Sequence, residues 1–441
     1  MKIFSTKLAQ VRGPRDVYLV WIGLYLAVDK LCVNCIICQP VSLLSMSNSN
    51  TIAHRLKRLR MSRGLSLDAL VASMGHVVTK QALSKYECGK ANPSPIVLNK
   101  LADTFKVKAS YFLREPQVSV KFIGYRKASS LSRKDQGRIE SLVTEVLEDR
   151  VNLQAMTGWP NGTHLPIHAH RISKIEDTER AAEELRTNWT LGQDPISSMV
   201  GMLEDHHIHV IEIDAIDKFD GICAVAVDEV TRSQAAGLVT SKGVSGERQR
   251  LSLAHELGHL VLKIGSGLDE EKAAFRFGAA FLAPAQVVYR EIGTKRDTIL
   301  SEELLLFKKR FGMSVQALVR RLFDLKIISE GYYRHWMMLI NRLKWKRKEP
   351  GELEPEQSQW LRQTALRAYA EGLITREEVE GLLGEPLDVE EPLTLIERRA
   401  FMKLPLEERR RILSEQADRL KSHYSDGADR SDLQSGDFVE Y

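Results

Sequence analysis

The chain has 441 residues, of which 43% are apolar and 27% charged, and its formal net charge is +5. These proportions are typical of globular proteins, so they exclude a disordered chain and a polytopic membrane protein. The length exceeds that of one ordinary domain and indicates about two to four domains. We expect a soluble, cytoplasmic protein.

The first 45 residues contain the most hydrophobic segment of the chain, residues 16–45. Asp29 and Lys30 divide this segment into pieces that are too short to cross a bilayer comfortably. We interpret residues 1–45 as an apolar extension outside the native protein, with translation beginning at Met46. A membrane anchor and a signal-like or interfacial segment are the alternatives.

The cysteines indicate neither a disulfide framework nor a metal cluster. Five is an odd number, and three of the five lie in the first 40 residues, at Cys32, Cys35 and Cys38. Their C-x-x-C-x-x-C spacing is that of metal-cluster ligands, but no fourth cysteine follows nearby and the surroundings are apolar. An odd count of this kind does not indicate paired cysteines.

Residues 51–115 form a basic block, with twelve Lys and Arg against four Asp and Glu. Apolar residues at helical spacing, with turn signals between them, predict five short helices. Ser66 and Thr79 are suited to cap the second and third helices, and Gly64 and Gly89 to end the first and third. Two short helices separated by a tight turn form a helix-turn-helix, so this block is the expected nucleic-acid surface.

The stretch "VTKQALSKYECGKANPSPIVLNKLADTFKV" resembles the phage-repressor-like (XRE, Cro/C1-type) helix-turn-helix family, from which it departs by two extra residues in the turn "GHVV". The resemblance implies that a homodimer binds double-stranded DNA, with the second helix of the motif in the major groove. Leu83 and Tyr86 are expected to face inward. The outward residues predicted to contact DNA are Thr79, Lys80, Gln81, Ser84 and Lys85. The alternative is a protein-interaction domain with solvated charges.

Residues 116–170 are interpreted as a connector that leads to a small sheet. They contain an extended stretch, "VSVKFIGYRK", and a polar helix that begins at Ser132. Two further helices precede the β-prone runs "IHVIEI", "DGICAVAVD" and "SQAAGLVTS". The expected fold class is therefore mainly α with a small β-sheet (α+β). His206, His207 and His209 flank the first of these strands and are interpreted as surface residues instead of metal ligands.

The stretch "LSLAHELGHLVL" carries two histidines four residues apart. On a helix, His255 and His259 lie one turn apart on the same face and can bind one metal ion. Glu256 lies where its carboxylate reaches a water activated by that metal. Zinc with two histidine ligands needs a third protein ligand, and the next helical stretch begins with three acids, Asp269, Glu270 and Glu271. A metal-free buried helix and a zinc site without proteolysis are the alternatives.

"RQRLSLAHELGHLVL" followed by "EKAAFRFGAAFLAP" resembles the ImmA/IrrE family of zinc metallopeptidases, whose third ligand opens an E-x-x-A-x-x-F-A-A-x-L-L-x-P pattern. The resemblance implies a Zn²⁺ cofactor held by His255, His259 and Glu271, with Glu256 as the general base. Phe275 stands where the family usually has Asn or Asp, and Gly278 where it has Ala. These departures concern the surroundings of the site more than zinc binding itself.

The family resemblance further implies a zincin-like HExxH peptidase domain over residues 171–335. Its expected reaction is hydrolysis of a peptide bond in a partner protein, namely a transcriptional repressor or another regulator. Together with the helix-turn-helix domain, this describes a DNA-binding regulator that is also a zinc endopeptidase.

The C-terminal third is predicted to be helical. Residues 336–390 contain a helical pair, and residues 395–441 combine an amphipathic helix over 406–424 with a polar end. This tail resembles short antitoxin-like proteins encoded beside bacterial toxins, which implies a partner-binding extension and a toxin as the partner. The alternative function is therefore an antitoxin-type transcriptional regulator whose zinc is structural. An ordinary helical tail is the plain alternative for this segment.

Overall fold

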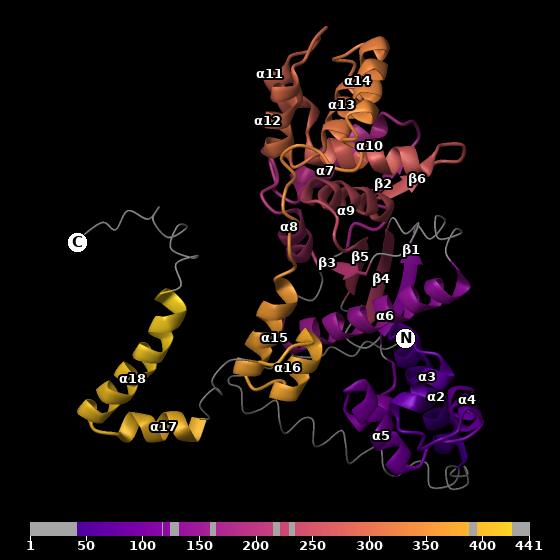
Figure 1. Ribbon diagram of the computed structural model, residues 1–441, viewed down its shortest axis with the longest axis vertical. Helices are drawn as coiled ribbons and strands as arrows, with labels where there is room; N and C mark the ends of the chain where they lie inside the picture. Colours follow the sequence, from indigo (N-terminus) through magenta and orange to yellow (C-terminus); the bar gives the residue numbers. More distant parts are fainter. Residues whose placement is uncertain are drawn as a thin grey trace, which may run out of the picture. The chain divides into compact units, whose positions relative to one another are not determined.

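The computed structural model in Figure 1 describes residues 42–116, 118–123, 132–158, 165–214, 221–228, 234–387 and 395–425. The apolar segment and the three cysteines before residue 42 lie outside these ranges. Within them, the chain is mainly helical with one four-stranded and one two-stranded sheet, which confirms the α+β fold class. None of the helices in these ranges has the length and apolar character needed to span a membrane. The chain divides into two compact units, at Leu361 and Arg362.

The helix-turn-helix domain opens the first unit. Its elements are α2 (Ser42–Ser62), α3 (Leu67–Ser73), α4 (Lys80–Glu87), α5 (Pro95–Phe105) and the 3₁₀ helix η1 (Ala109–Leu113). They enclose a core that includes Leu56, Leu59, Leu70, Leu83 and Leu101. The Ser66 and Thr79 side chains accept hydrogen bonds from the third residue beyond them, as the capping prediction requires. The five predicted helices are therefore confirmed, the fifth as a 3₁₀ helix.

The longer turn between α3 and α4 is accommodated by two residues with left-handed backbone. Gly75 has φ +69° and His76 has φ 60°, a region that glycine enters freely and histidine more often than most residues. Two ion pairs then connect α4 to α3 and to α2. Lys80 lies 2.6 Å from Asp68 across the turn, and the Arg60 guanidinium donates to both oxygens of Glu87 at the end of α4.

Two arginines of the basic block do not belong to its surface. Arg55 is 1% exposed and Arg58 6%, and both pair with Glu148 on α6 (Arg133–Met156). Arg55 also donates to the carbonyl of Arg114. Contact with the Glu148 carboxylate offsets part of the cost of burying the two guanidinium groups. The two arginines therefore join the helix-turn-helix domain to α6 instead of presenting charge to DNA.

The four-stranded sheet has the order β1 (Val118–Ile123), β4 (Ile222–Asp228), β5 (Gln234–Ser241), β3 (Ile208–Ile213). β4 pairs antiparallel with β1 and β5, whereas β3 and β5 are parallel. Both faces are covered, because alternate residues enter different cores. Ile222 and Ala224 pack with α6, and Cys223 and Val225 pack in the core that contains α8 (Met199–Asp205) and α9 (Gly246–Val261). The three predicted β-prone runs are thus strands.

Further helices lie on the side of α9 away from the sheet, and α10 packs directly against α9 (Figure 1). These are α7 (Asp177–Asn188), α10 (Glu270–Leu282), α11 (Ala285–Ile292), α12 (Ser301–Phe311), α13 (Val315–Asp324) and α14 (Glu330–Arg342), and β2 (His170–Ile172) pairs with β6 (Leu262–Ile264). The Glu179 carboxylate on α7 accepts hydrogen bonds from Nη1 and Nη2 of Arg321, at 2.6 and 2.7 Å. It also accepts one from Nε of Arg276, at 3.2 Å. This carboxylate connects α7, α10 and α13.

The second unit is small and helical. The predicted helical pair is present as α15 (Trp360–Ala370), whose first two residues belong to the first unit, and α16 (Arg376–Leu383). Ala365, Val379 and Leu387 form its core. The tail contains α17 (Leu395–Lys403) and α18 (Leu406–Ser425), and α18 confirms the predicted amphipathic helix at 406–424.

Candidate metal centre

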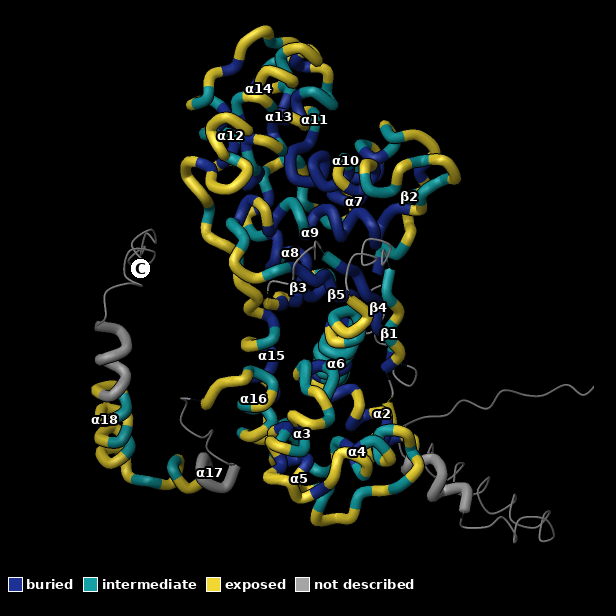
Figure 2. Tube along the Cα trace, turned by 45° about the vertical axis from the view of Figure 1, so that its right-hand side comes forward, coloured by how far each residue is buried: buried dark blue, intermediate teal, exposed yellow. Residues whose placement is uncertain are grey.

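The helix that carries both histidines, α9, is buried along nearly its whole length (Figure 2). Two glycines allow α10 to pack closely against it. A Cβ atom on Gly258 would lie 3.1 Å from Cα of Ala274, and one on Gly278 would lie 3.0 Å from the His255 nitrogen. Such distances are shorter than ordinary contacts, so even alanine would push the helices apart. Glycine at 278, where the resembled family has alanine, therefore suits the close approach of α9 and α10.

Three side chains from α9 and α10 converge on one point. The Nε2 atoms of His255 and His259 are 3.1 Å apart, and the two Glu271 oxygens lie 3.4 Å from Nε2 of His255 and 3.6 Å from Nε2 of His259. Ligand atoms bound tetrahedrally to zinc at its usual bond lengths are separated by roughly 3.3 Å. The spacing and the donor types therefore fit a zinc ion. Among the described residues, these three side chains form the group that could hold a metal.

The three acids at the start of α10 have different contacts. Asp269 caps the helix, accepting the Lys272 backbone N–H at 3.1 Å, and this bond lowers the pKa of its carboxyl group. Glu270 lies 3.5 Å from Nδ1 of His259, on the side of the ring away from the convergent atoms. Glu271 alone approaches both Nε2 atoms. Glu270 and Glu271 therefore approach different nitrogen atoms of the His259 ring.

Glu256 follows His255 on α9 and is 6% exposed. Its carboxylate lies against Gly221 at the start of β4, and the Cys223 thiol is close by on the same strand. Burial, together with the Glu256 charge, raises the pKa of that thiol well above its usual value. A neutral, fully buried thiol is a poor nucleophile, so the site is not suited to cysteine chemistry.

Arg276 and Tyr289, which lie near the site in sequence, have their polar groups engaged elsewhere. Arg276 pairs with Glu179, and the Tyr289 hydroxyl donates to the Leu325 carbonyl at 3.1 Å. The two partners lie on α7 and directly after α13, not on α9. The structure therefore identifies no oxyanion donor at these positions.

Comparison with known proteins identifies two segments of the first unit. Residues 56–112 match the family model described as helix-turn-helix, and residues 204–323 match the IrrE N-terminal-like domain, which includes all of α9 and α10. The chain therefore contains a helix-turn-helix domain and an IrrE N-terminal-like domain. The matched domain is that of a metallopeptidase family, and the resemblance seen in the sequence is confirmed. No curated protein and no solved structure matched the chain.

A segment beyond the matched range holds the N-terminal half of α9 in the IrrE-like domain. The Gly246 N–H donates to the Leu353 carbonyl at 2.7 Å, and Gln249 exchanges two hydrogen bonds with the backbone of Glu356. The Glu356 carboxylate pairs with Arg250 and accepts the Val200 N–H. We call residues 349–360 the clamp segment, because it fixes the helix on which both histidines lie. Sequence reasoning missed it, since these contacts join residues about 100 positions apart.

Phe275 is the departure from the family pattern whose side chain contacts the His255 ring. Its ring centroid is 4.0 Å from that of His255, and the residue is 46% exposed. An aromatic ring here places apolar surface beside a ligand-type histidine, where a carboxylate or amide would make a polar contact. The surroundings of His255 are thus more apolar than the family pattern implies.

The interpretation of the histidines near β3 as surface residues is wrong for two of them. His207 is 5% exposed and His209 is fully buried, because the strand they enter is covered on both faces. His207 contacts Gln154, and His209 packs its ring on Trp360 with centroids 4.4 Å apart. Burial lowers the pKa of both imidazoles, so they are neutral core residues.

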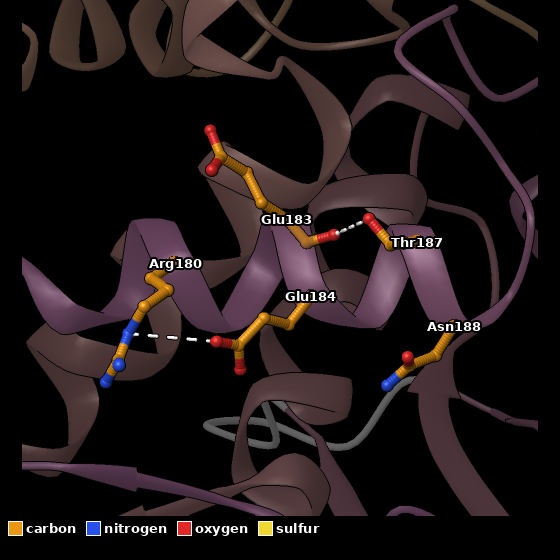
Figure 3. A pocket seen from close by; sticks show the side chains of 5 residues that line it. All are labelled: Arg180, Glu183, Glu184, Thr187 and Asn188. Atoms are coloured by element: carbon orange, nitrogen blue, oxygen red, sulfur yellow. Dashed lines mark hydrogen bonds and ion pairs between the residues drawn. The ribbon is translucent and has the colours of Figure 1, made fainter.

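A shallow hollow on the outer face of α7 is separate from the histidine site (Figure 3). It is lined by Arg180, Glu183, Glu184, Thr187 and Asn188. Its polar groups largely pair within the helix, as Arg180 does with Glu184 and Thr187 with the Glu183 carbonyl. His170 pairs with Glu184 from the neighbouring β2.

The residues predicted to contact DNA lie where the sequence pattern places them. Thr79, Lys80, Gln81 and Lys85 are exposed and Ser84 is partly exposed, whereas Leu83 is buried and Tyr86 packs against the core. The Lys80 ammonium group also forms an ion pair with the Asp68 carboxylate. The exposed side of α4 therefore carries short polar and basic side chains of the kind that read base edges and hold phosphates.

Proposed function

We propose that the protein is a DNA-binding regulator with zinc-dependent endopeptidase activity, which hydrolyses a peptide bond in a repressor or another regulatory partner. The observation that carries the proposal is the convergence of two Nε2 atoms and a carboxylate within 3.1 to 3.6 Å, with Glu256 on the same helix. The match to the IrrE N-terminal-like domain supports it.

In the proposed mechanism, His255, His259 and Glu271 would hold the metal, and Glu270 would orient His259. A bound zinc ion supplies Lewis-acid chemistry, which polarises the scissile carbonyl and makes water easier to deprotonate. The Glu256 carboxylate accepts the proton of the attacking water and then passes it to the departing amide nitrogen. Burial of Glu256 protects this proton transfer from bulk solvent.

Removal of the metal tests this proposal. The full-length protein, loaded with one equivalent of Zn²⁺, is incubated with a purified helix-turn-helix regulator encoded near its gene, and fragments are identified by mass spectrometry. We expect a single cut, which 1,10-phenanthroline abolishes and added Zn²⁺ restores. A protein that binds zinc and loses stability on chelation, but cuts no regulator, supports the antitoxin-type alternative with a structural zinc.

The DNA-binding part of the proposal predicts different effects for two residues of α4. Lys85→Ala should weaken binding to duplexes of any sequence, because one phosphate contact is lost. The plot of the logarithm of the association constant against the logarithm of the salt concentration should become less steep by about 1. Gln81→Ala should relax preference at one base pair by about 1 to 3 kcal/mol, measured by selection from a random duplex library. Lys295→Ala, an equal charge change at an exposed position of the IrrE-like domain, is the control.

If Lys85→Ala and Lys295→Ala change the salt slope equally, α4 is not the DNA-binding helix and the domain serves protein interaction. Binding as a homodimer, and binding of a toxin by residues 395–441, remain predictions. The tail does offer exposed apolar side chains at Met402, Leu406 and Leu413, which would suit a partner surface.

A further inference from the structure

The residue that lies against the Glu256 carboxylate is Gly221, immediately before β4. If Gly221 carried a Cβ atom, the three nearest heavy atoms would all belong to Glu256. Cδ would lie at 2.7 Å and Cγ at 3.0 Å, and Oε1 would lie closer still. Ordinary contacts between carbon atoms are about 3.5 to 4.0 Å. The Glu256 side chain therefore occupies the space that any side chain at position 221 would need.

Even alanine, which adds only a Cβ atom, would require the Glu256 side chain to shift, because all three atoms nearest that Cβ belong to Glu256. Glycine at position 221 therefore leaves room for the carboxylate.

Glu256 has little freedom to move away from such a side chain. It is 6% exposed, and the α9 backbone on which it lies is fixed by α10 and by the clamp segment. In a helix the side chain points back along its own face, which leaves few rotamers. A group at position 221 would therefore displace the carboxylate from its place beside residue 221.

We propose that Gly221 is a positioning residue for proton transfer, because the absence of its side chain sets the place of the Glu256 carboxylate beside the scissile bond. This inference rests on the proposed peptidase function. It predicts that Gly221→Ala impairs the reaction without removing a metal ligand.

The first test uses full-length Gly221→Ala. Zinc content should stay at one equivalent, because His255, His259 and Glu271 are untouched. The substrate is the regulator found in the metal-removal experiment. For its cleavage, kcat should fall by about 100-fold with KM unchanged, because a catalytic group displaced by about 1 Å loses roughly that much rate. Gly137→Ala is the matched control. Its Cβ would meet Cε of Met61 at 2.5 Å, a similar clash with a flexible side chain far from α9, and it should retain full activity.

The second test needs no substrate and no metal. Glu256→Ala removes all three atoms that oppose a side chain at position 221. Gly221→Ala should therefore lower the melting temperature of the metal-free protein in the wild-type background and leave it unchanged in the Glu256→Ala background, a coupling that a double-mutant cycle measures. If Gly221→Ala prevents folding, the double variant should fold.

Equal destabilisation in both backgrounds would overturn the inference, and so would full activity of Gly221→Ala. A wild-type protein that cleaves nothing would instead refute the peptidase function. In that case the double-mutant cycle of melting temperatures alone decides whether Gly221 positions Glu256.

Discussion

Glu256→Gln is expected to retain one equivalent of zinc and to lose cleavage of its partner regulator by about 10²- to 10⁴-fold, the usual contribution of a general base. The amide has nearly the same shape as the carboxylate but cannot accept the proton of the attacking water. Glu256 is not one of the three side chains whose ligand atoms converge, so metal binding should persist. Zinc content by atomic absorption and cleavage by western blot of the co-expressed regulator measure the two effects separately.

His259→Ala is the companion variant, because it removes a ligand instead of the base. It should lose both zinc and activity, whereas Glu256→Gln loses activity alone. If Glu256→Gln and the wild type both hold zinc and leave the regulator equally intact, the metal is structural. The protein would then be a transcriptional regulator of the antitoxin type.

Lys308→Met is expected to lower the free energy of unfolding by about 3 to 5 kcal/mol, because it removes one partner of a buried ionic group. The Lys308 ammonium is 1% exposed and donates to Glu247 at 2.8 Å and to Glu349 at 3.0 Å. Glu247 lies in the first turn of α9, and Glu349 begins the clamp segment. The variant leaves two buried carboxylates without their cation, so the N-terminal end of α9 should loosen and zinc affinity should fall.

Urea unfolding measures this loss, with Lys309→Met as the control at an exposed neighbouring position, where a change within about 0.5 kcal/mol is expected. The pH dependence provides a second check. Burial by itself would raise the pKa of Glu247, but hydrogen bonds from Lys308 and the Leu353 amide hold it below its usual value. A lowered carboxyl pKa stabilises the fold above the usual Glu pKa, and this stabilisation is lost as the pH falls through the lowered value. The difference between wild type and Lys308→Met should therefore narrow in acid, and a constant difference would contradict the ionic explanation.

Local pattern predicts much of this fold because its signals act over a few residues. Ser66 and Thr79 cap the helices that their positions indicate, and the runs at 208–213, 222–228 and 234–241 are strands. The i, i+4 spacing of His255 and His259 is enough to bring their rings together, since both lie on one helix. In the candidate site, only the choice among the three acids needed the family resemblance, and the contacts of Glu271 agree with it.

The sequence by itself determined the helix-turn-helix, the strands and the pair of histidines, because each depends on spacing within one element. Tertiary structure alone decided that Arg55 and Arg58 are buried against Glu148, that the clamp segment holds α9, and that Gly221 lies against Glu256. These contacts join residues that are distant in the chain, and the pairing of Arg55 with Glu148 spans 93 positions. Charge and hydrophobic periodicity describe which face of a helix is polar, but a polar face becomes buried when another element supplies the opposite charge.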